Sequence, residues 1–443
     1  MKKRFAIMLL AAICLTGCAD ASTAGGDTAE NLPQTENASA DDSSKQDAGG
    51  RTEIVYYTWG DEEGYMTEIV DAFNAQSDTT YVNVTFIPST GVEYNEKVVS
   101  MLSSGSQMDL FSASNVKELV KYRDAGSICD LTDAIQSSGL DIDKYGTSFL
   151  ETKKDEKFYG LPYRYSTMGL FYNKRIFEKE GIEVPGLMSW DEYAELAKRL
   201  TKTREDGSVQ WGGFIPDWLG EPILTVQRGS SVMDPDTSAL REWLELLGKL
   251  YNGDRSHMSF EEMKSTSTDW VKIFLAGDVA MLPNGEYTIG NVLQEMKNNP
   301  DGVGDFEMGV TYMPLPDGIE EPVTVGGPNT FLMINQNTEH FENAFEFACF
   351  LCGQEGAGYL VENGMIPAYL DEDVIRMYKG AVDMDGIDEM LSAETHYECD
   401  PAVDFSAVDT IWREEKELYL IGEETLDQSM EMFEQRRTEV LGQ

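Results

Sequence analysis

Residues 53–112 alternate between two hydrophobic periods, and this alternation limits the fold more than any other feature of the sequence. Strand and helix patterns follow one another at residues 53–58, 66–73, 81–87, 94–102 and 108–112. In the first helical pattern, Met66, Ile69, Val70 and Phe73 recur at the spacing of one helix face. Strands separated by helices imply a mainly parallel sheet, so we expect an α/β protein.

A second α/β unit is expected further along the chain. Ser189 and Glu192 have the spacing of a capping box, in which each side chain binds the backbone N–H of the other residue. Tyr193, Leu196 and Leu200 then follow with the apolar stripe of a surface helix. This helix should begin a second group of strands and helices.

The first eighteen residues have the layout of a bacterial secretory leader. Basic residues at positions 2–4 precede an apolar run at positions 5–13 that is too short to span a membrane. The sequence Leu15-Thr16-Gly17-Cys18 resembles a lipobox, whose cysteine thiol receives a diacylglyceryl group and becomes the mature N-terminus. Residues 1–17 are therefore predicted to be a signal peptide, with Cys18 as a membrane anchor. An ordinary signal peptide with a chance cysteine is the alternative.

The segment behind this cysteine has the composition of a tether. Between positions 19 and 50 there is no aromatic residue, and seven acids stand against the single Lys45. Such a segment cannot bury enough apolar surface to offset its ordering entropy. Residues 18–50 are therefore predicted to be a flexible tether that holds the folded part near the membrane.

The length and charge of the remaining chain restrict its architecture and partners. About 390 residues exceed what one hydrophobic core usually fills, so two lobes are expected. The formal charge of −45 argues against nucleic acid, because phosphates need a basic face. The acidic surface does not identify a ligand, since it also serves solubility.

The cysteines allow a metal site but favour core packing. Cys349 and Cys352 have the spacing of a zinc or redox pair, and His396 with Cys399 could complete four ligands. However, Phe345 shares one predicted helix face with both members of the pair. We therefore expect packing in the core, with no metal and no other cofactor.

A series of motifs runs through the chain in a fixed order. They read Gly126-Ser-Ile-Cys-Asp-Leu-Thr132, Lys157-Phe-Tyr-Gly-Leu-Pro162, Leu170-Phe-Tyr-Asn-Lys174, Phe274-Leu-Ala-Gly-Asp-Val-Ala-Met281, Gly285-Glu-Tyr287, Met313-Pro-Leu-Pro-Asp-Gly318, Val325-Gly-Gly327 and Gly364-Met-Ile-Pro367. In this order they resemble the extracellular solute-binding proteins of family 1, which are maltose-binding-protein-like carbohydrate receptors. The resemblance covers residues 53–443. Two positions depart from it, Met108 where the family has Pro and Tyr287 where it has Trp.

The resemblance implies a fold and a function. The fold would be the two-lobed periplasmic-binding-protein-like α/β fold of type II, with the ligand between lobes joined by several crossovers. The protein would be a monomeric sugar receptor of an ATP-binding-cassette importer, anchored outside the cytoplasm and delivering its ligand to the membrane permease. By analogy, the lobes are residues 51–164 plus 314–365, and 166–312 plus 366–443.

A sugar cleft needs aromatic plates beside short polar groups, because a sugar has polarised C–H faces and a rim of hydroxyls. The expected contacts are Trp59, Glu62, Ser112, Asn115, Tyr163, Arg164, Trp218, Glu286, Tyr287, Gly327, Asn329 and Trp412. Tyr287 occupies the family's cleft aromatic position, and Gly327 would let backbone approach the ligand. Capped strand ends, a structural salt bridge of Arg164 and core packing of Trp412 are the alternatives.

Two other functions fit parts of the sequence. A secreted glycoside-active enzyme would use two carboxylates, but in so acidic a chain a suitable pair carries no weight. No Gly-x-Ser-x-Gly or His-Glu-x-x-His motif occurs, and the three histidines stand in unrelated contexts. An adhesive surface lipoprotein would share the leader and tether without needing the ordered motifs. We therefore expect no catalytic residue.

Overall fold

The computed structural model describes residues 50–88, 92–150, 152–217, 219, 222–266, 268–299, 305–397, 402 and 404–442. The predicted signal peptide, Cys18 and nearly all of the tether lie outside these residues, as does Trp218. The chain from Ala48 onward forms one compact unit.

The strands of this unit form one mixed sheet. They are β1 (Thr52–Trp59), β2 (Thr80–Ile87), β3 (Leu110–Ala113), β4 (Leu161–Asn173), β5 (Lys202–Thr203), β6 (Val209–Gly213), β7 (Val279–Gly285), β8 (Met308–Thr311), β9 (Val323–Ile334) and β10 (Glu394–His396). The strand order is β2-β1-β3-β9-β4-β7-β6-β5, with β10 beside β9 and β8 beside β4. The α/β class is as predicted.

Helices pack against both ends of this sheet. They are α1 (Glu63–Gln76), α2 (Val92–Ser104), α3 (Val116–Asp124), α4 (Thr132–Ser138), α5 (Gly146–Leu150), α6 (Lys174–Glu180), α7 (Trp190–Leu200), α8 (Ile223–Gln227), α9 (Ser238–Gly248), α10 (Phe260–Thr266), α11 (Trp270–Leu275), α12 (Tyr287–Asn298), α13 (Phe341–Cys352), α14 (Gln354–Glu362), α15 (Glu372–Ala381), α16 (Ile387–Ser392), α17 (Phe405–Leu420) and α18 (Leu426–Leu441). Short 3-10 turns η1 (Gly60–Glu62) and η2 (Ile142–Tyr145) and the π-turn η3 (Lys249–Gly253) complete the described elements.

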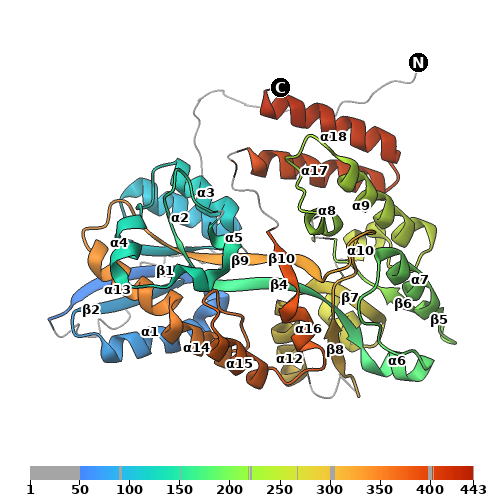
Figure 1. Ribbon diagram of the computed structural model, residues 1–443, viewed down its shortest axis with the longest axis horizontal. Helices are drawn as coiled ribbons and strands as arrows, with labels where there is room; N and C mark the ends of the chain where they lie inside the picture. The colour runs from blue at the N-terminus through green and yellow to red at the C-terminus, as the bar shows by residue number, and fades with distance from the viewer. Residues whose placement is uncertain are drawn as a thin grey trace, which may run out of the picture. The chain divides into compact units, whose positions relative to one another are not determined.

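Two long strands join the two halves of the molecule. In the first half, β1, β2 and β3 lie with α1–α5, α13 and α14; in the second half, β5–β8 lie with α6–α12 and α16–α18 (Figure 1). β4 pairs antiparallel with β9 through residues 161–167, and then with β7 and β8 through residues 168–173. The two strands therefore run through the middle of the sheet and belong to both halves.

The expectation of a mainly parallel sheet holds only in part, because β4 is antiparallel to β7, β8 and β9 and β5 is antiparallel to β6. β1 pairs parallel with β2 and β3, and β6 pairs parallel with β7. In contrast, β9 is antiparallel to both β3 and β4. The centre is antiparallel because β9 runs from the second half into the first half and pairs there with β3 in the opposite direction.

The predicted local elements agree with the observed ones. Helix α1 buries Met66, Ile69, Val70 and Phe73, the residues that the helical spacing placed on one face. At the start of α7, Ser189 accepts a hydrogen bond from the N–H of Glu192, and the Glu192 carboxylate accepts one from the N–H of Ser189. Such a cap is worth about 0.5–2 kcal/mol of stability, because it satisfies backbone donors that the first helical turn leaves free.

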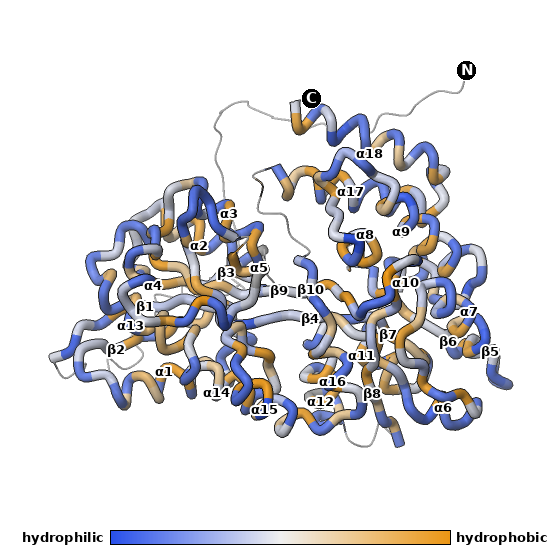
Figure 2. The backbone as a smooth tube through the Cα atoms, in the orientation of Figure 1, coloured by the Kyte–Doolittle hydropathy of each residue, from blue (hydrophilic) through white to orange (hydrophobic). Residues whose placement is uncertain are grey.

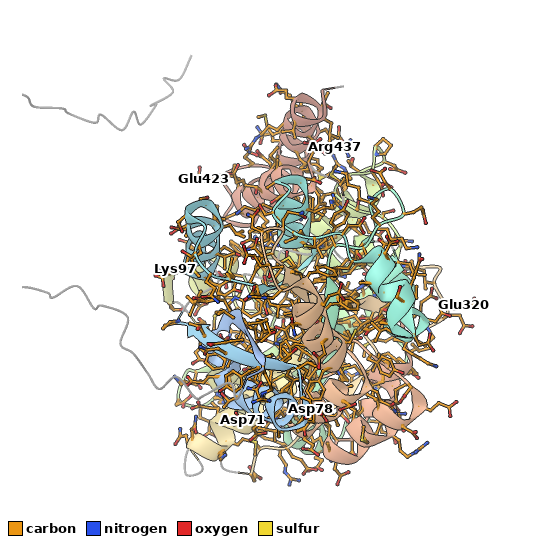
Figure 3. All side chains as sticks on the ribbon, turned by 90° about the vertical axis from the view of Figure 1, so that its left-hand side faces the viewer. Asp71, Asp78, Lys97, Glu320, Glu423 and Arg437 are labelled. Carbon is orange, nitrogen blue, oxygen red and sulfur yellow. The ribbon has the colours of Figure 1, made fainter. Side chains whose placement is uncertain are left out.

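Hydrophobic residues fill the interior and charged residues cover the outside. Leu332, Met333 and Ile334 of β9 are fully buried at the centre of the sheet. Figure 2 shows hydrophobic and hydrophilic residues alternating along helices such as α17 and α18, as expected for helices with one face on a core. Asp71, Glu320 and Glu423 are exposed, and Glu320 and Glu423 lie at the edges of the molecule in Figure 3. No helix in the described ranges has the length and apolarity needed to span a bilayer.

Candidate functional site

Glu62 is a buried carboxylate at the end of the first strand. It closes η1, which directly follows β1, and only 4% of the residue is exposed. Its Oε2 accepts hydrogen bonds from the hydroxyls of Thr58 at 2.5 Å and Tyr163 at 2.9 Å, and Tyr65 donates to Oε1. Burial raises the pKa of Glu62, and the positive charge of Arg164 and these hydrogen bonds oppose the rise.

Ser112 and Tyr163 are buried in the hydroxyl network that holds Glu62. The Tyr163 hydroxyl lies 3.1 Å from Oγ of Ser112, and that Oγ lies 2.8 Å from the hydroxyl of Tyr56. Tyr94 donates to the carbonyl oxygen of Ser112 at 3.0 Å. Because Ser112 is fully buried and Tyr163 nearly so, the two residues act here by fixing the carboxylate.

Arg164 lies between two buried carboxylates. Its Nη1 is 3.7 Å from Oε1 of Glu62, which is an ion pair but too long for a hydrogen bond. Glu286 lies close enough for its charge to stabilise the guanidinium as well. The Arg164 side chain is 23% exposed, and no group among the described residues accepts a hydrogen bond from its guanidinium. Its N–H fork is therefore available to a ligand oxygen.

Glu286 belongs to the second half of the molecule and lies near Arg164. It lies between β7 and α12, and its Oε2 accepts hydrogen bonds from Oγ of Ser166 at 2.7 Å and the N–H of Thr167 at 3.3 Å. Burial raises the pKa of Glu286, and Arg164 opposes the rise. Glu62, Arg164 and Glu286 thus form one charged cluster across β4, with Glu62 from the first half and Glu286 from the second.

Tyr287 begins α12 beside this cluster. A Cβ added to Gly285 would lie 2.3 Å from the Tyr287 ring, so the ring lies close against the backbone of β7 at Gly285. The Tyr287 hydroxyl donates to Oδ1 of Asn284 at 2.6 Å, and the residue is half-buried. An aromatic ring that is held in this way and still partly exposed is suited to stack on a sugar face.

Trp59 ends β1, and Asn115 lies two residues after the end of β3. The Trp59 ring packs 4.8 Å from the ring of Tyr94 and is 9% exposed, so little of its surface is available. Asn115 caps α3, where its Oδ1 accepts from the N–H of Glu118 at 3.2 Å. Both positions fit the capped strand ends that the sequence left open as an alternative.

A side chain of this protein, Tyr397, lies close against the backbone at Gly327, where a ligand was expected. Gly327 has a φ of +145°, and a Cβ there would meet the ring of Tyr397 at 2.5 Å. Tyr397 also donates to the carbonyl of Pro328 at 2.7 Å. Gly327 is therefore required by Tyr397, in a conformation that residues with a side chain rarely adopt. Asn329, two residues on, is half-buried and accepts from the Thr330 hydroxyl at 3.2 Å.

Trp412 lies in the helical core of the second half. It is fully buried on α17 and packs edge-on against Phe433 of α18, with ring centroids 5.5 Å apart. A fully buried ring presents no face to a ligand. The structure thus places Trp412 in the core, which was the alternative to a binding role.

The cysteine motif packs in the first half. Cys352 is buried on α13, with Sγ 3.5 Å from the carbonyl oxygen of Leu161, and Cys349 is half-buried. Nδ1 of His396 donates to the carbonyl of Val226 at 2.9 Å, and Cys399 lies outside the described residues. No group of metal-ligating side chains is found in the part of the chain that the structure describes.

Sequence reasoning missed four polar residues that complete the site. Thr58 and Tyr65 bind Glu62, Ser166 binds Glu286, and Asn284 binds Tyr287. Each lies within four residues of a predicted site residue. That proximity was the available signal, although it does not reveal which side chain turns toward the site.

Curated relatives match most of the chain at low identity. An arabinooligosaccharide-binding protein of Bacillus subtilis is 23% identical over 69% of this chain and 70% of its own length. A multiple sugar-binding protein of Streptococcus mutans is 22% identical over 71% of this chain and 74% of its own length. The sn-glycerol-3-phosphate-binding periplasmic protein of Escherichia coli is 23% identical over 68% and 70% of the two chains.

Solved structures show that this fold is known. A sugar transporter of Rhizobium etli in an open conformation has a TM-score of 0.77 and 22% identity, covering 87% of this chain and 99% of its own. A substrate-binding protein from Listeria monocytogenes in complex with cycloalternan has a TM-score of 0.74 and 21% identity, covering 88% and 99%. A family model described as bacterial extracellular solute-binding protein matches residues 68–373. The chain therefore belongs to the bacterial extracellular solute-binding protein family.

Proposed function

We propose that this protein captures a carbohydrate outside the cytoplasm and delivers it unchanged to the permease of an ATP-binding-cassette importer. The observation that carries the proposal is the cluster of Glu62, Arg164 and Glu286 beside the half-buried ring of Tyr287. Arg164 offers free N–H donors and Tyr287 an aromatic face, which are the two kinds of contact that a sugar needs. Relatives named for binding sugars support the ligand class.

The ligand would lie between two lobes, residues 51–164 plus 314–365 and residues 166–312 plus 366–443. The position of Arg164 on β4 supports this arrangement, because β4 runs through both halves of the sheet. A ligand that binds Arg164 and Tyr287 would contact both lobes and favour their closed arrangement. The protein would act as a monomer.

A binding role fits the carboxylates better than a hydrolytic one. Glycoside hydrolysis needs one carboxyl group that exchanges a proton with the substrate and one that attacks or activates water. Both oxygens of Glu62 already accept hydrogen bonds from Thr58, Tyr65 and Tyr163, and its residue is only 4% exposed. These contacts hold the Glu62 carboxyl group beside Arg164 and leave it little access to a substrate.

Titration calorimetry tests this function directly. The purified protein is titrated with arabino-, malto- and manno-oligosaccharides, with sn-glycerol 3-phosphate as the anionic comparison. We expect micromolar or tighter binding of at least one saccharide and recovery of that saccharide intact by chromatography. Absence of binding throughout the panel would contradict a carbohydrate receptor. Recovery of a shortened saccharide would instead support a glycoside-active enzyme.

The lipid anchor is a separate part of the proposal. Residues 15–18 support it by their resemblance to a lipobox, and the tether composition of residues 19–50 supports a folded part held off the membrane. Cys18→Ala should move the protein from the membrane fraction to the soluble fraction of the producing cells, with an unchanged melting temperature. Retention of the variant in the membrane fraction would rule out Cys18 as the anchor.

A further inference from the structure

Helices α3 and α17 come from opposite halves of the molecule and are joined by an ion pair. α3 packs on β3 and β9 in the first half, and α17 packs on α9 and α18 in the second. Figure 1 shows the start of α17 reaching toward α3. Nζ of Lys117 on α3 lies 2.8 Å from Oδ2 of Asp409 on α17. This contact spans the two halves without using the strands that connect them.

The surroundings of the pair make it stronger than an ordinary surface ion pair. The side chains of Lys117 and Asp409 are only 21% and 10% exposed. Nε of Arg413 donates to the same carboxylate oxygen at 3.1 Å, and the Lys117 ammonium lies 5.1 Å from the ring centroid of Phe405. Burial would raise the pKa of Asp409, but the charges of Lys117 and Arg413 outweigh it and keep the pKa below its usual value. Asp409 is therefore ionised at neutral pH.

Lys117 also lines a groove beside α3 and the start of α17. This groove has a volume of about 500 Å³ and is lined by Asn115, Lys117 and Lys121 near α3 and by Ala402, Phe405 and Ser406 near the start of α17. Asn115, a candidate ligand contact, caps the helix that carries Lys117. Breaking the pair would therefore let the two walls of the groove move apart beside the candidate site.

We propose that Lys117 and Asp409 form a latch that holds the two halves together over the bound ligand and so determines how long the ligand stays. The proposal rests on the carbohydrate-receptor function and adds the residues that control release. Opening must separate the two charges, whereas Asp409 keeps Arg413 on its own helix. The latch should therefore slow ligand dissociation and contribute little to the stability of either half.

The experiment compares three variants of the full-length protein. Lys117→Met keeps the length and apolar stem of the side chain but removes its charge, and Lys117→Arg keeps the charge. Lys121→Met is the matched control, since it removes a charge from the same helix and groove. Stopped-flow fluorescence measures association and dissociation of arabinotriose, with maltotriose as a second probe. Small-angle scattering without sugar measures the radius of gyration.

Lys117→Met should dissociate from the sugar about tenfold faster, equivalent to about 1.4 kcal/mol, with a nearly unchanged association rate and melting temperature. Its radius of gyration should also exceed that of the wild type. Lys117→Arg and Lys121→Met should stay within about twofold of the wild-type rate, as expected where the latch charge is kept.

Two outcomes would overturn the latch. In one, Lys117→Met has the wild-type dissociation rate and the wild-type radius of gyration. In the other, Lys117→Arg is as fast as Lys117→Met, which would mean that the contact depends on shape and not on charge. If the wild type binds neither sugar, the carbohydrate function fails, while the scattering comparison still decides whether Lys117 holds the halves together.

Discussion

At the residue scale, the two buried carboxylates are held by different sets of hydrogen bonds. Glu62 accepts hydrogen bonds from three hydroxyl side chains, whereas Glu286 accepts through one oxygen from Ser166 and Thr167. Arg164 lies close to both carboxylates but donates a hydrogen bond to neither. Such an arrangement fixes the guanidinium by charge alone and leaves its directional bonds for a ligand.

Tyr287 is the residue whose removal should separate binding from folding. Tyr287→Ala removes a partly exposed ring, so we expect binding of the preferred saccharide to weaken by about 1–3 kcal/mol in calorimetry. Tyr287→Phe keeps the ring and removes the hydroxyl that donates to Asn284, so its affinity should remain close to that of the wild type. If Tyr287→Ala lowers the melting temperature of the free protein strongly and leaves affinity unchanged, Tyr287 belongs to the core.

The sequence singled out residues that the structure brings together around Arg164, but it could not say how their side chains pair. Glu62, Ser112 and Tyr163 were expected as separate ligand contacts, yet they form one hydrogen-bonded network between strands far apart in the chain. Gly327 was expected to face the ligand, and it faces Tyr397 instead. Sequence spacing predicts which residues lie on the same face of one helix or strand. It does not predict which side chain of another helix or strand packs against that face.

At the scale of elements, local patterns were predictive and long-range pairings were not. The strand and helix order of residues 53–112 follows from hydrophobic period alone, and so does the capping box of α7. The insertion of β9 between β3 and β4 has no local signal, because its antiparallel partners are more than a hundred residues away in sequence. Trp412 shows the same limit, since core packing was one of its two interpretations but the packing of α18 over it was not predicted.

At the scale of the whole molecule, the site and the latch both require the halves to move relative to each other. The radius of gyration measured by small-angle scattering should fall when a saturating saccharide is added, because a ligand that contacts both halves favours their closed arrangement. If the halves close on the ligand, the chain would bend at the segments that connect them, which include β4 and β9. An identical radius with and without bound ligand would contradict closure.

The place of β9 in the sheet also bears on when this chain can fold. β3 is synthesised early, but residues 331–334, with which it pairs, come long after it. Until they arrive, one side of β3 has no strand partner, and the sheet of the first half stays incomplete through most of translation. A nascent chain of this kind completes its fold late. That delay suits a protein that is expected to cross a membrane as an unfolded chain. While the sheet is incomplete in the cytoplasm, the chain is still unfolded and can be exported.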